Sequence, residues 1–185
     1  MGYGGAAPEK DGGAMSLDGT RYYGKFRGVV LNNVDPMQQG RLQAQVPGVL
    51  DNLTSWALPC LPMAGIQSGM FAVPAIGSGV WIEFEQGDLN YPVWTGGWWG
   101  SASETPAIAL VTPPTVSHFV LQTMLQTMLM ISDDPSPAGG ILLKTSTGAM
   151  LAINSTGITI SNGQGATIVM SGPTVTVNAG ALTVT

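Results

Sequence analysis

The chain has 185 residues, a net charge of −5 and only 9% charged residues, about a third of the charge density of an ordinary soluble domain. Neutralising phosphates requires clustered Lys and Arg, so we expect no nucleic-acid partner, and the single Cys60 excludes an intrachain disulfide framework or a cysteine-based zinc site. No apolar run is long enough for a membrane-spanning helix and no secretory signal is recognisable, so we expect synthesis in the cytoplasm.

Aromatic and charged residues are concentrated in the first half of the chain. All five Trp and all four Tyr precede residue 101, and no charged residue follows Lys144. This change in composition predicts an arm over residues 1–20, a first domain over 21–100, a Pro-containing linker over 101–118 and a second domain over 119–185. The Gly-rich arm is expected to be flexible, with a strap onto a neighbouring subunit as the alternative.

Short extended segments separated by turn residues fill the first domain. The alternation is clearest over residues 79–85, where Val80, Ile82 and Phe84 occupy every second position. Similar patterns predict strands over residues 22–34, 41–46, 53–58 and 91–98. Five short strands without an amphipathic helix predict an all-β domain that closes, or nearly closes, into a small barrel.

The same domain carries an ordered motif. Three segments follow one another with regular spacing: DPMQQGRLQAQVPG (residues 35–48), Trp56-Ala57 and GMFAVPAIGSGVWIEFEQGDLNYPVWTGGWW (residues 69–99). This frame resembles the OB-fold domain of the central spike of contractile injection systems, a family of phage baseplate assembly protein V, tail-spike hubs, type VI VgrG proteins and spikes of phage-tail-like particles. The chain is most similar in kind to the compact spikes of phage-tail-like particles, because it is short and has no inserted lysozyme domain.

Glycine recurs at near-constant intervals in the second domain, at positions 140, 148, 157, 165, 172 and 180. Short alternating runs such as Ile158-Thr159-Ile160 lie between these glycines, with Thr, Ser and Asn at the outward positions. The repeat predicts a β-solenoid or β-prism, which we call the stalk, to which each repeat adds one strand.

A single copy of the stalk gains little from folding. Ordering a strand of about five residues costs roughly 5–10 kcal/mol of backbone entropy, whereas burying its two or three apolar side chains returns only about 3–9 kcal/mol. Three copies around one axis would bury these side chains against their equivalents, so we expect a homotrimer. The family resemblance implies the same arrangement, a trimeric intertwined β-helix, or triangular β-prism, over residues 119–185.

Residues 119–131 (FVLQTMLQTMLMI) permit two interpretations. Leu125 and Leu129 fit an apolar helical stripe, but they also fit one face of a strand together with Phe119. We favour extended structure, because the family that the chain resembles has strands at the base of its stalk.

No group of residues points to a catalytic, cofactor or metal site. His118 is the only histidine and has no nucleophile motif to serve, so we expect a structural role. Asp133 and Asp134 lie in a Pro-rich and Gly-rich turn, which favours a solvated loop over a cation site. We therefore expect a protein that is not an enzyme.

Two glutamates and the single cysteine also have structural interpretations. Glu83 and Glu85 are expected to share one face of a strand, where a solvated or subunit-facing role is favoured over a glycosidase pair. Cys60 lies between two prolines and is expected to be buried and inert.

Basic and aromatic residues suggest contact surfaces on the first domain. Trp98 and Trp99 are expected to lie in a subunit interface, with stacking on a sugar or base as the alternative. A solvated surface, or a contact with an acidic ring of the tube or hub, is expected for four basic residues: Arg21, Lys25, Arg27 and Arg41.

The resemblance implies a structural central spike that joins a threefold needle to a sixfold inner tube and pierces a target envelope. Its partners would be inner-tube and hub baseplate proteins, a PAAR-type tip protein on Val184 and Thr185, and the target membrane transiently during puncture. The chain would be made in the bacterial cytoplasm and assembled into the baseplate of a phage tail or phage-tail-like particle. Two alternatives remain open: an OB-fold binding module for oligosaccharide or single-stranded nucleic acid, and a cell-wall hydrolase hub.

Overall fold

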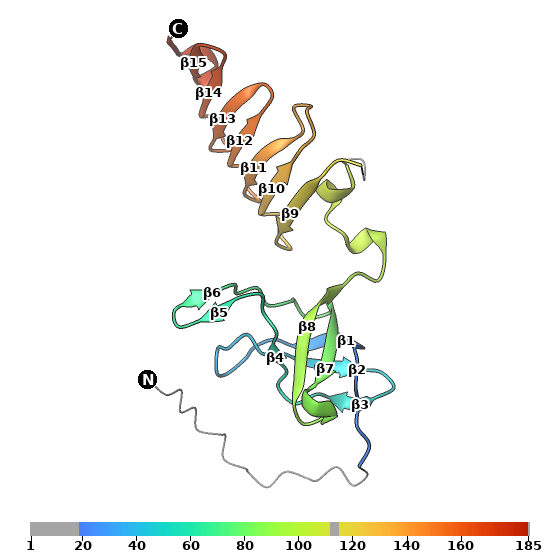
Figure 1. The fold of residues 1–185 in the computed structure, drawn as a ribbon. Helices are drawn as coiled ribbons and strands as arrows, with labels where there is room; N and C mark the ends of the chain where they lie inside the picture. The colour runs from blue at the N-terminus through green and yellow to red at the C-terminus, as the bar shows by residue number, and fades with distance from the viewer. Residues whose placement is uncertain (1–18, 112–114, 185) are drawn as a thin grey trace, which may run out of the picture. The chain divides into compact units, whose positions relative to one another are not determined.

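The computed structural model describes residues 19–111 and 115–184, and the expected arm over residues 1–20 lies almost wholly outside them. The chain divides between Gly100 and Ser101 into two compact units, which are described separately below (Figure 1). In the described residues the secondary structure consists of strands and short 3-10 turns, without an α-helix, which confirms the all-β prediction.

The first unit is a small barrel built around one curled sheet. Its sheet has the order β3-β2-β1-β7-β8-β4, and β5 pairs separately with β6. The elements are β1 (Phe26–Asn32), β2 (Gln43–Val46), β3 (Leu50–Leu53), β4 (Leu58–Pro59), β5 (Ala64–Gly65), β6 (Ser68–Gly69), β7 (Gly79–Phe84), the 3-10 turn η1 (Glu85–Gly87) and β8 (Pro92–Trp98). Leu42 precedes β2 and Ala57 precedes β4, and the two residues exchange backbone hydrogen bonds of 3.2 and 2.7 Å. This bridge closes the ring of strands β2-β1-β7-β8-β4 into a small barrel, which fits an OB fold.

Alternation places the barrel core on the inner face of the sheet. Val80, Ile82 and Phe84 on β7 are buried, while the side chains between them are partly exposed. The core is completed by residues from β1, the β2 region, the β4 region and β8: Val30, Leu42, Ala44, Val46, Ala57 and Trp94. All of these core residues belong to the first unit, which therefore has a hydrophobic core of its own. Fully burying each large apolar side chain stabilises the fold by about 1.5–3 kcal/mol.

The predicted strand over residues 53–58 was wrong in its extent. β3 ends at Leu53 and β4 begins at Leu58, because Thr54 leaves the ladder and turns inward. Its hydroxyl accepts a hydrogen bond of 3.0 Å from the Ala44 N–H and its own N–H donates to the Ala44 carbonyl at 2.9 Å. The β5–β6 hairpin that follows was not predicted, because strands of two residues show no alternation.

The second unit is an eight-stranded antiparallel sheet in which each strand pairs with the next along the chain (Figure 1, yellow to red). It is preceded by the 3-10 turns η2 (Ala102–Glu104) and η3 (Ala107–Leu110). Its elements are β9 (His118–Gln122), β10 (Met128–Ser132), β11 (Gly140–Lys144), β12 (Met150–Asn154), β13 (Gly157–Ser161), β14 (Thr167–Ser171), β15 (Thr174–Val177), η4 (Asn178–Gly180) and β16 (Leu182–Val184). The prediction of one strand per repeat is confirmed, and residues 119–131 form the β9–β10 hairpin rather than a helix.

Two of the recurring glycines stand at the start of strands rather than in turns. Gly157 has a φ of +130°, and a Cβ there would collide with the carbonyl oxygen of Met170 on β14. Gly140 has a φ of +83° and is equally close to the carbonyl of Ile153 on β12. Only glycine combines this backbone conformation with such a close approach of the neighbouring strand.

Candidate assembly surfaces

The strand pairing of the stalk places its side chains on two faces. Residues directly opposite one another in antiparallel strands lie on the same face, and successive side chains along a strand alternate between faces. One row of opposed residues runs through Phe119, Ile131, Ile141, Ile153 and Ile158. The register thereby defines a face that we call the apolar face: Phe119, Leu121, Leu129, Ile131, Ile141, Leu143, Leu151, Ile153, Ile158, Ile160, Ile168, Met170, Val175, Val177 and Leu182.

The apolar face is open to solvent in the single chain. Phe119 is 50% exposed near one end of the sheet, and Leu182 is 58% exposed near the other. Monomeric proteins rarely expose a contiguous apolar patch of more than a few hundred Å², whereas this face crosses all eight strands of the sheet. Its extent therefore marks a surface that another chain covers.

The opposite face of the sheet, which we call the outer face, changes in character along the stalk. Near its start it carries the apolar residues Val120, Met128 and Met130, and η3 contacts β9 at this end. From β13 onward, Val169 is the apolar residue among Thr and Ser side chains: Thr159, Ser161, Thr167, Ser171, Thr174 and Thr176. The predicted uncharged polar surface is thus found on the second half of the stalk.

Uncharged side chains also hold the turns at the sheet edges. The Asn154 Oδ1 accepts a hydrogen bond of 2.9 Å from the Thr156 N–H, and Asn162 Oδ1 accepts from Gln164 and Ala166 at 2.8 and 3.0 Å. Asn178 Oδ1 accepts from the Thr167 N–H at 3.0 Å, which ties the η4 turn to the start of β14. Asn therefore satisfies backbone donors here without introducing charge.

The expected tip contact lies at the far end of this unit. Val184 is the last residue of β16, and Thr185 lies outside the described residues. The pairing of a tip protein with these two residues stays a prediction.

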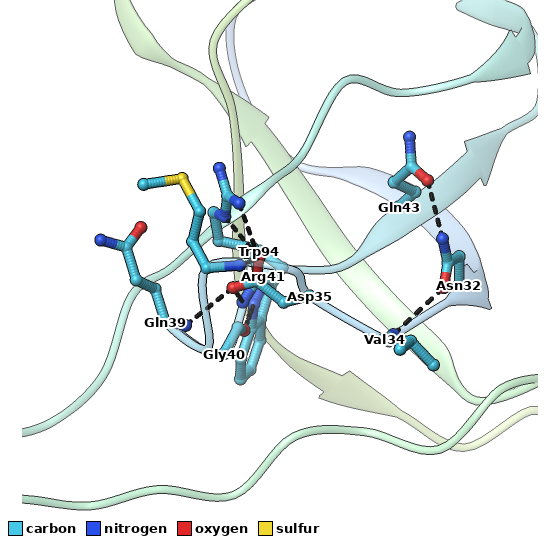
Figure 2. A network of polar contacts seen from close by, with 9 residues as sticks. Asn32, Val34, Asp35, Gln39, Gly40, Arg41, Gln43 and Trp94 are labelled. Atoms are coloured by element: carbon cyan, nitrogen blue, oxygen red, sulfur yellow. Dashed lines mark hydrogen bonds and ion pairs between the residues drawn. The ribbon is translucent and has the colours of Figure 1, made fainter. Parts of the chain in front are cut away.

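An ion pair organises the loop between β1 and β2. Asp35 accepts backbone hydrogen bonds of 2.9 and 2.8 Å from Met37 and Gln39, and the Arg41 guanidinium contacts the same carboxylate at 2.6 Å (Figure 2). The hydrogen bond from Arg41 and those from the backbone, which outweigh the effect of burial, hold the pKa of Asp35 well below its usual range. The DP and GR parts of the sequence motif therefore form one structural unit.

The same loop is attached to the barrel core. The Trp94 Nε1–H donates a hydrogen bond of 3.1 Å to the Gly40 carbonyl, and both residues lie beside the Asp35–Arg41 pair (Figure 2). The Arg41 guanidinium also lies 5.4 Å from the centre of the Trp56 ring. These contacts explain why Trp56 and the DP…GR segment occur together in the motif.

The four basic residues singled out from the sequence each have a partner within the barrel unit. Arg21 and Lys25 are about half exposed and pair with Asp88 at 3.7 Å and with Glu83 at 2.6 Å, respectively. Arg27 lies over the rings of Trp81 and Trp98 at 5.7 and 5.1 Å. The Arg41 side chain, paired with Asp35, is only 15% exposed. Arg21, Lys25 and Arg27 are thus exposed to solvent, and Arg41 is the one of the four whose charge is largely shielded.

Within each of two sequence pairs, Trp98 with Trp99 and Glu83 with Glu85, the two residues lie in different environments. The Trp98 Nε1–H donates to the Val80 carbonyl at 3.1 Å, whereas Trp99 is 64% exposed. The expectation that Glu83 and Glu85 share a strand face was wrong, because β7 ends at Phe84 and Glu85 begins η1.

The remaining polar candidates occupy structural positions. The His118 Nδ1–H donates a hydrogen bond of 3.1 Å to the Val116 carbonyl. The Ser136 N–H donates to Asp134 Oδ1 at 2.8 Å and, with the Ser136 hydroxyl, lowers the pKa of Asp134 against the effect of burial. Over the described ranges, no three His, Cys, Asp or Glu residues gather into a group that could hold a metal ion.

Cys60 is exposed, so the prediction that it is buried was wrong. Cys60 directly follows β4 at the edge of the sheet, where its N–H donates a hydrogen bond of 2.9 Å to the Trp94 carbonyl, and its side chain is not part of the barrel core. In the described part of the chain, no helix is long and apolar enough to cross a membrane.

Comparisons with known families match both units. Residues 26–99 match the type VI secretion system/phage-baseplate injector OB domain, and residues 118–183 match the phage baseplate V C-terminal trimerisation domain. A comparison with curated proteins found no match. The closed barrel and the open-faced antiparallel sheet fit these two domains in the same order. The chain therefore belongs to the phage baseplate V family of spike proteins, which carry an injector OB domain followed by a trimerisation domain.

Proposed function

We propose that three copies of this chain form the central spike of a contractile injection machine, with the apolar faces of three stalk sheets turned toward a common axis. The observation that carries the proposal is the uninterrupted apolar face, opposite an outer face that becomes polar along the stalk. Three such sheets form a triangular prism in which every chain contributes one side. A closed threefold arrangement buries all three apolar faces at once.

The outer surface of the prism suits passage through a lipid envelope. Its side chains after β12 are mainly Thr and Ser, and no charged residue follows Lys144. Transferring an ion out of water costs far more than transferring a hydroxyl group. A needle with this surface would meet a smaller barrier when sheath contraction drives it through a membrane.

The barrels would form the collar that connects the spike to the inner tube and hub. Arg21, Lys25 and Arg27 are exposed, so they are the best placed for an acidic ring on those proteins. Arg41 is only 15% exposed and would act by shaping the barrel surface, because it is engaged with Asp35 and the Trp56 ring. At the opposite end of the chain, Val184 and Thr185 would receive a PAAR-type tip protein.

Both matched domains are structural parts of a baseplate, which fits a protein that is not an enzyme. Trp98, the residue that a sugar-binding or base-binding module would use for stacking, is engaged by Arg27, Trp81 and the Val80 carbonyl. This placement favours a packing role over ligand recognition.

The location of the chain in an assembled particle tests the proposal. A tagged chain should copurify with the particle, and electron cryomicroscopy should show three copies on the axis of the baseplate. Absence from the particle, or a position away from the axis, would overturn the proposal.

The membrane step can be tested on the same particles. Thr176→Lys on the outer face places a charge on each copy, and Thr176→Gln is the uncharged control. Particles with Lys should release dye from lipid vesicles less efficiently than particles with Gln. Equal release would contradict the role given to the uncharged surface.

A further inference from the structure

A second uncharged region lies inside the barrel unit, where most of the charge of the chain is found. No Asp, Glu, Lys, Arg or His occurs between Asp51 and Glu83. This stretch leaves the barrel wall after β4, forms the β5–β6 hairpin and returns at β7. It shares its lack of charge with residues 145–185 of the stalk, which contribute to the apolar face.

The hairpin exposes apolar side chains and has little internal support. Met63 is 61% exposed, Phe71 is 72% exposed, and Ile66 at the tip of the hairpin is 90% exposed. Each strand has two residues, joined in the pairs Ala64–Gly69 and Gly65–Ser68. An isolated two-stranded hairpin is marginally stable in water, so a hairpin this short and apolar needs a packing partner.

A groove of about 800 Å³ lies beside the hairpin within the barrel unit. The hairpin forms one wall, Gln38 and Gln39 of the β1–β2 loop line another part, and Leu58 and Leu61 add apolar surface. Ile66 does not line the groove. Each copy thus offers two separate features, an apolar projection at Ile66 and a mostly apolar groove with amide groups at its edge.

We propose that the β5–β6 hairpin of one copy packs into this groove of the next copy, so that the three barrels close a second ring around the spike axis. The inference rests on the trimer of the proposed function. A threefold ring is built from head-to-tail contacts, which require two different and complementary patches on each subunit. The projection at Ile66 and the adjacent groove supply such a pair.

Tethering and charge favour a copy of this chain over another protein as the occupant. The trimerisation domain holds three barrels on tethers. Tethering raises the effective concentration of each barrel for its neighbours to about 1 mM. The uncharged stretch lacks the side chains that steer a separate protein to its site, and the exposed cations Arg21 and Lys25 lie outside it.

Photo-crosslinking of the full chain tests this contact. Ile66 is replaced by p-benzoylphenylalanine, and the same group in place of Tyr91, which is 56% exposed elsewhere on the barrel unit, is the control. Light scattering first establishes that each variant is a trimer. After irradiation, the variant at position 66 should give covalent dimers and trimers on a denaturing gel, with adducts mapped by mass spectrometry to residues 58–63 or to Gln38 and Gln39.

A second substitution separates a specific contact from chance collision. Met63→Asp lies on the wall of the groove, is well exposed and should leave the barrel folded. It should reduce the adduct from position 66 at least tenfold without changing the background from position 91. A trimer that gives only intrachain adducts, or adducts with a hub protein in assembled particles, would overturn this inference alone, whereas a monomer would overturn the proposed trimeric spike as well.

Discussion

The barrel and the stalk have the same alternation of apolar and polar residues, but the apolar face is covered within the chain in the barrel and is open in the stalk. In the barrel the sheet curls until the Leu42–Ala57 bridge closes it, and the apolar side chains meet one another inside a single chain. In the stalk the strands follow one another in an open sheet, and much of the apolar face is exposed to solvent in the single chain. Among the described residues, Met130 is the one buried hydrophobic residue of the stalk, whereas the others belong to the barrel.

This difference shows that a strand pattern specifies which face is apolar but not what covers it. Closure by the chain itself gives a domain whose stability is independent of other copies. An open sheet makes folding and association a single event, because the apolar face is satisfied only in the oligomer. Substitutions directed at one unit at a time test this difference.

The largest effect is expected from a charge on the apolar face. Ile160→Asp would place three carboxylates on the axis of the trimer, where they are desolvated and repel one another, so the trimer should be lost. Size-exclusion chromatography with light scattering measures this directly. The matched control is Thr159→Asp, one residue away on the outer face of the same strand, which should stay trimeric.

A cavity in the barrel core should act on the barrel alone. Ile82→Ala removes a fully buried side chain and should lower the free energy of unfolding of the barrel by about 2–5 kcal/mol. The mass of the oligomer should not change, since the stalk holds the copies together. Chemical denaturation followed by tryptophan fluorescence reports on the barrel, because all five Trp lie there. Glu83→Ala on the outer side of the same strand is the control. Dissociation of the trimer by Ile82→Ala would contradict the separation of the two units.

The Asp35–Arg41 pair predicts a pH dependence that belongs to the barrel. The folded-state pKa of Asp35 lies far below its ordinary value of 3.8, so its contribution to stability is fully present above the unfolded-state pKa and is lost as the pH falls through the folded-state pKa. The difference in barrel stability between the native chain and Asp35→Asn should therefore be constant above about pH 5 and shrink below about pH 4. Denaturation curves measured across this range by tryptophan fluorescence check this trend, and a difference that stays constant at the acidic end of the range would contradict it.

A smaller effect is expected from a methyl group on a stalk glycine. Gly157→Ala would push the new Cβ into the Met170 carbonyl and should cost more than about 1 kcal/mol per copy. Gly165→Ala is the matched control, because Gly165 also has a positive φ, of +102°, but no atom lies within 4 Å of its added Cβ. The midpoint temperature of thermal unfolding of the trimer should be highest for the native chain, lower for Gly165→Ala and lowest for Gly157→Ala. An equal decrease in both variants would show that the positive φ alone causes the cost.

Much of this organisation could be predicted from the sequence, where alternation was long enough to reveal a face. Strands of five residues or more, such as β7 and β13, have apolar side chains at every second position. The assembly face of the stalk was implied by the same pattern, although its full extent required the register between strands. The interpretation of residues 119–131 stayed open because Leu125 and Leu129 satisfy both periodicities, and the turn at residues 123–127 resolves it.

The failures of prediction have local causes. Thr54 interrupts the strand predicted over residues 53–58, because its hydroxyl accepts the hydrogen bond of the Ala44 N–H in place of a backbone carbonyl. The sequence does not indicate this role, since β-branched residues are typical of strands. The β5–β6 hairpin is too short to show a period, and Cys60 is exposed because it follows the short edge strand β4 outside the barrel core. The absence of charge between Asp51 and Glu83 was the signal that could have drawn attention to this segment as a surface for another chain.

The mass of the full chain in solution shows whether the stalk folds only as a trimer. Light scattering across a dilution series, with circular dichroism to follow the strands, should give three times the chain mass at every concentration at which the stalk is folded. Dissociation and unfolding of the stalk should occur together. A folded stalk at the mass of one chain would contradict the account, because it would show that the apolar face needs no partner.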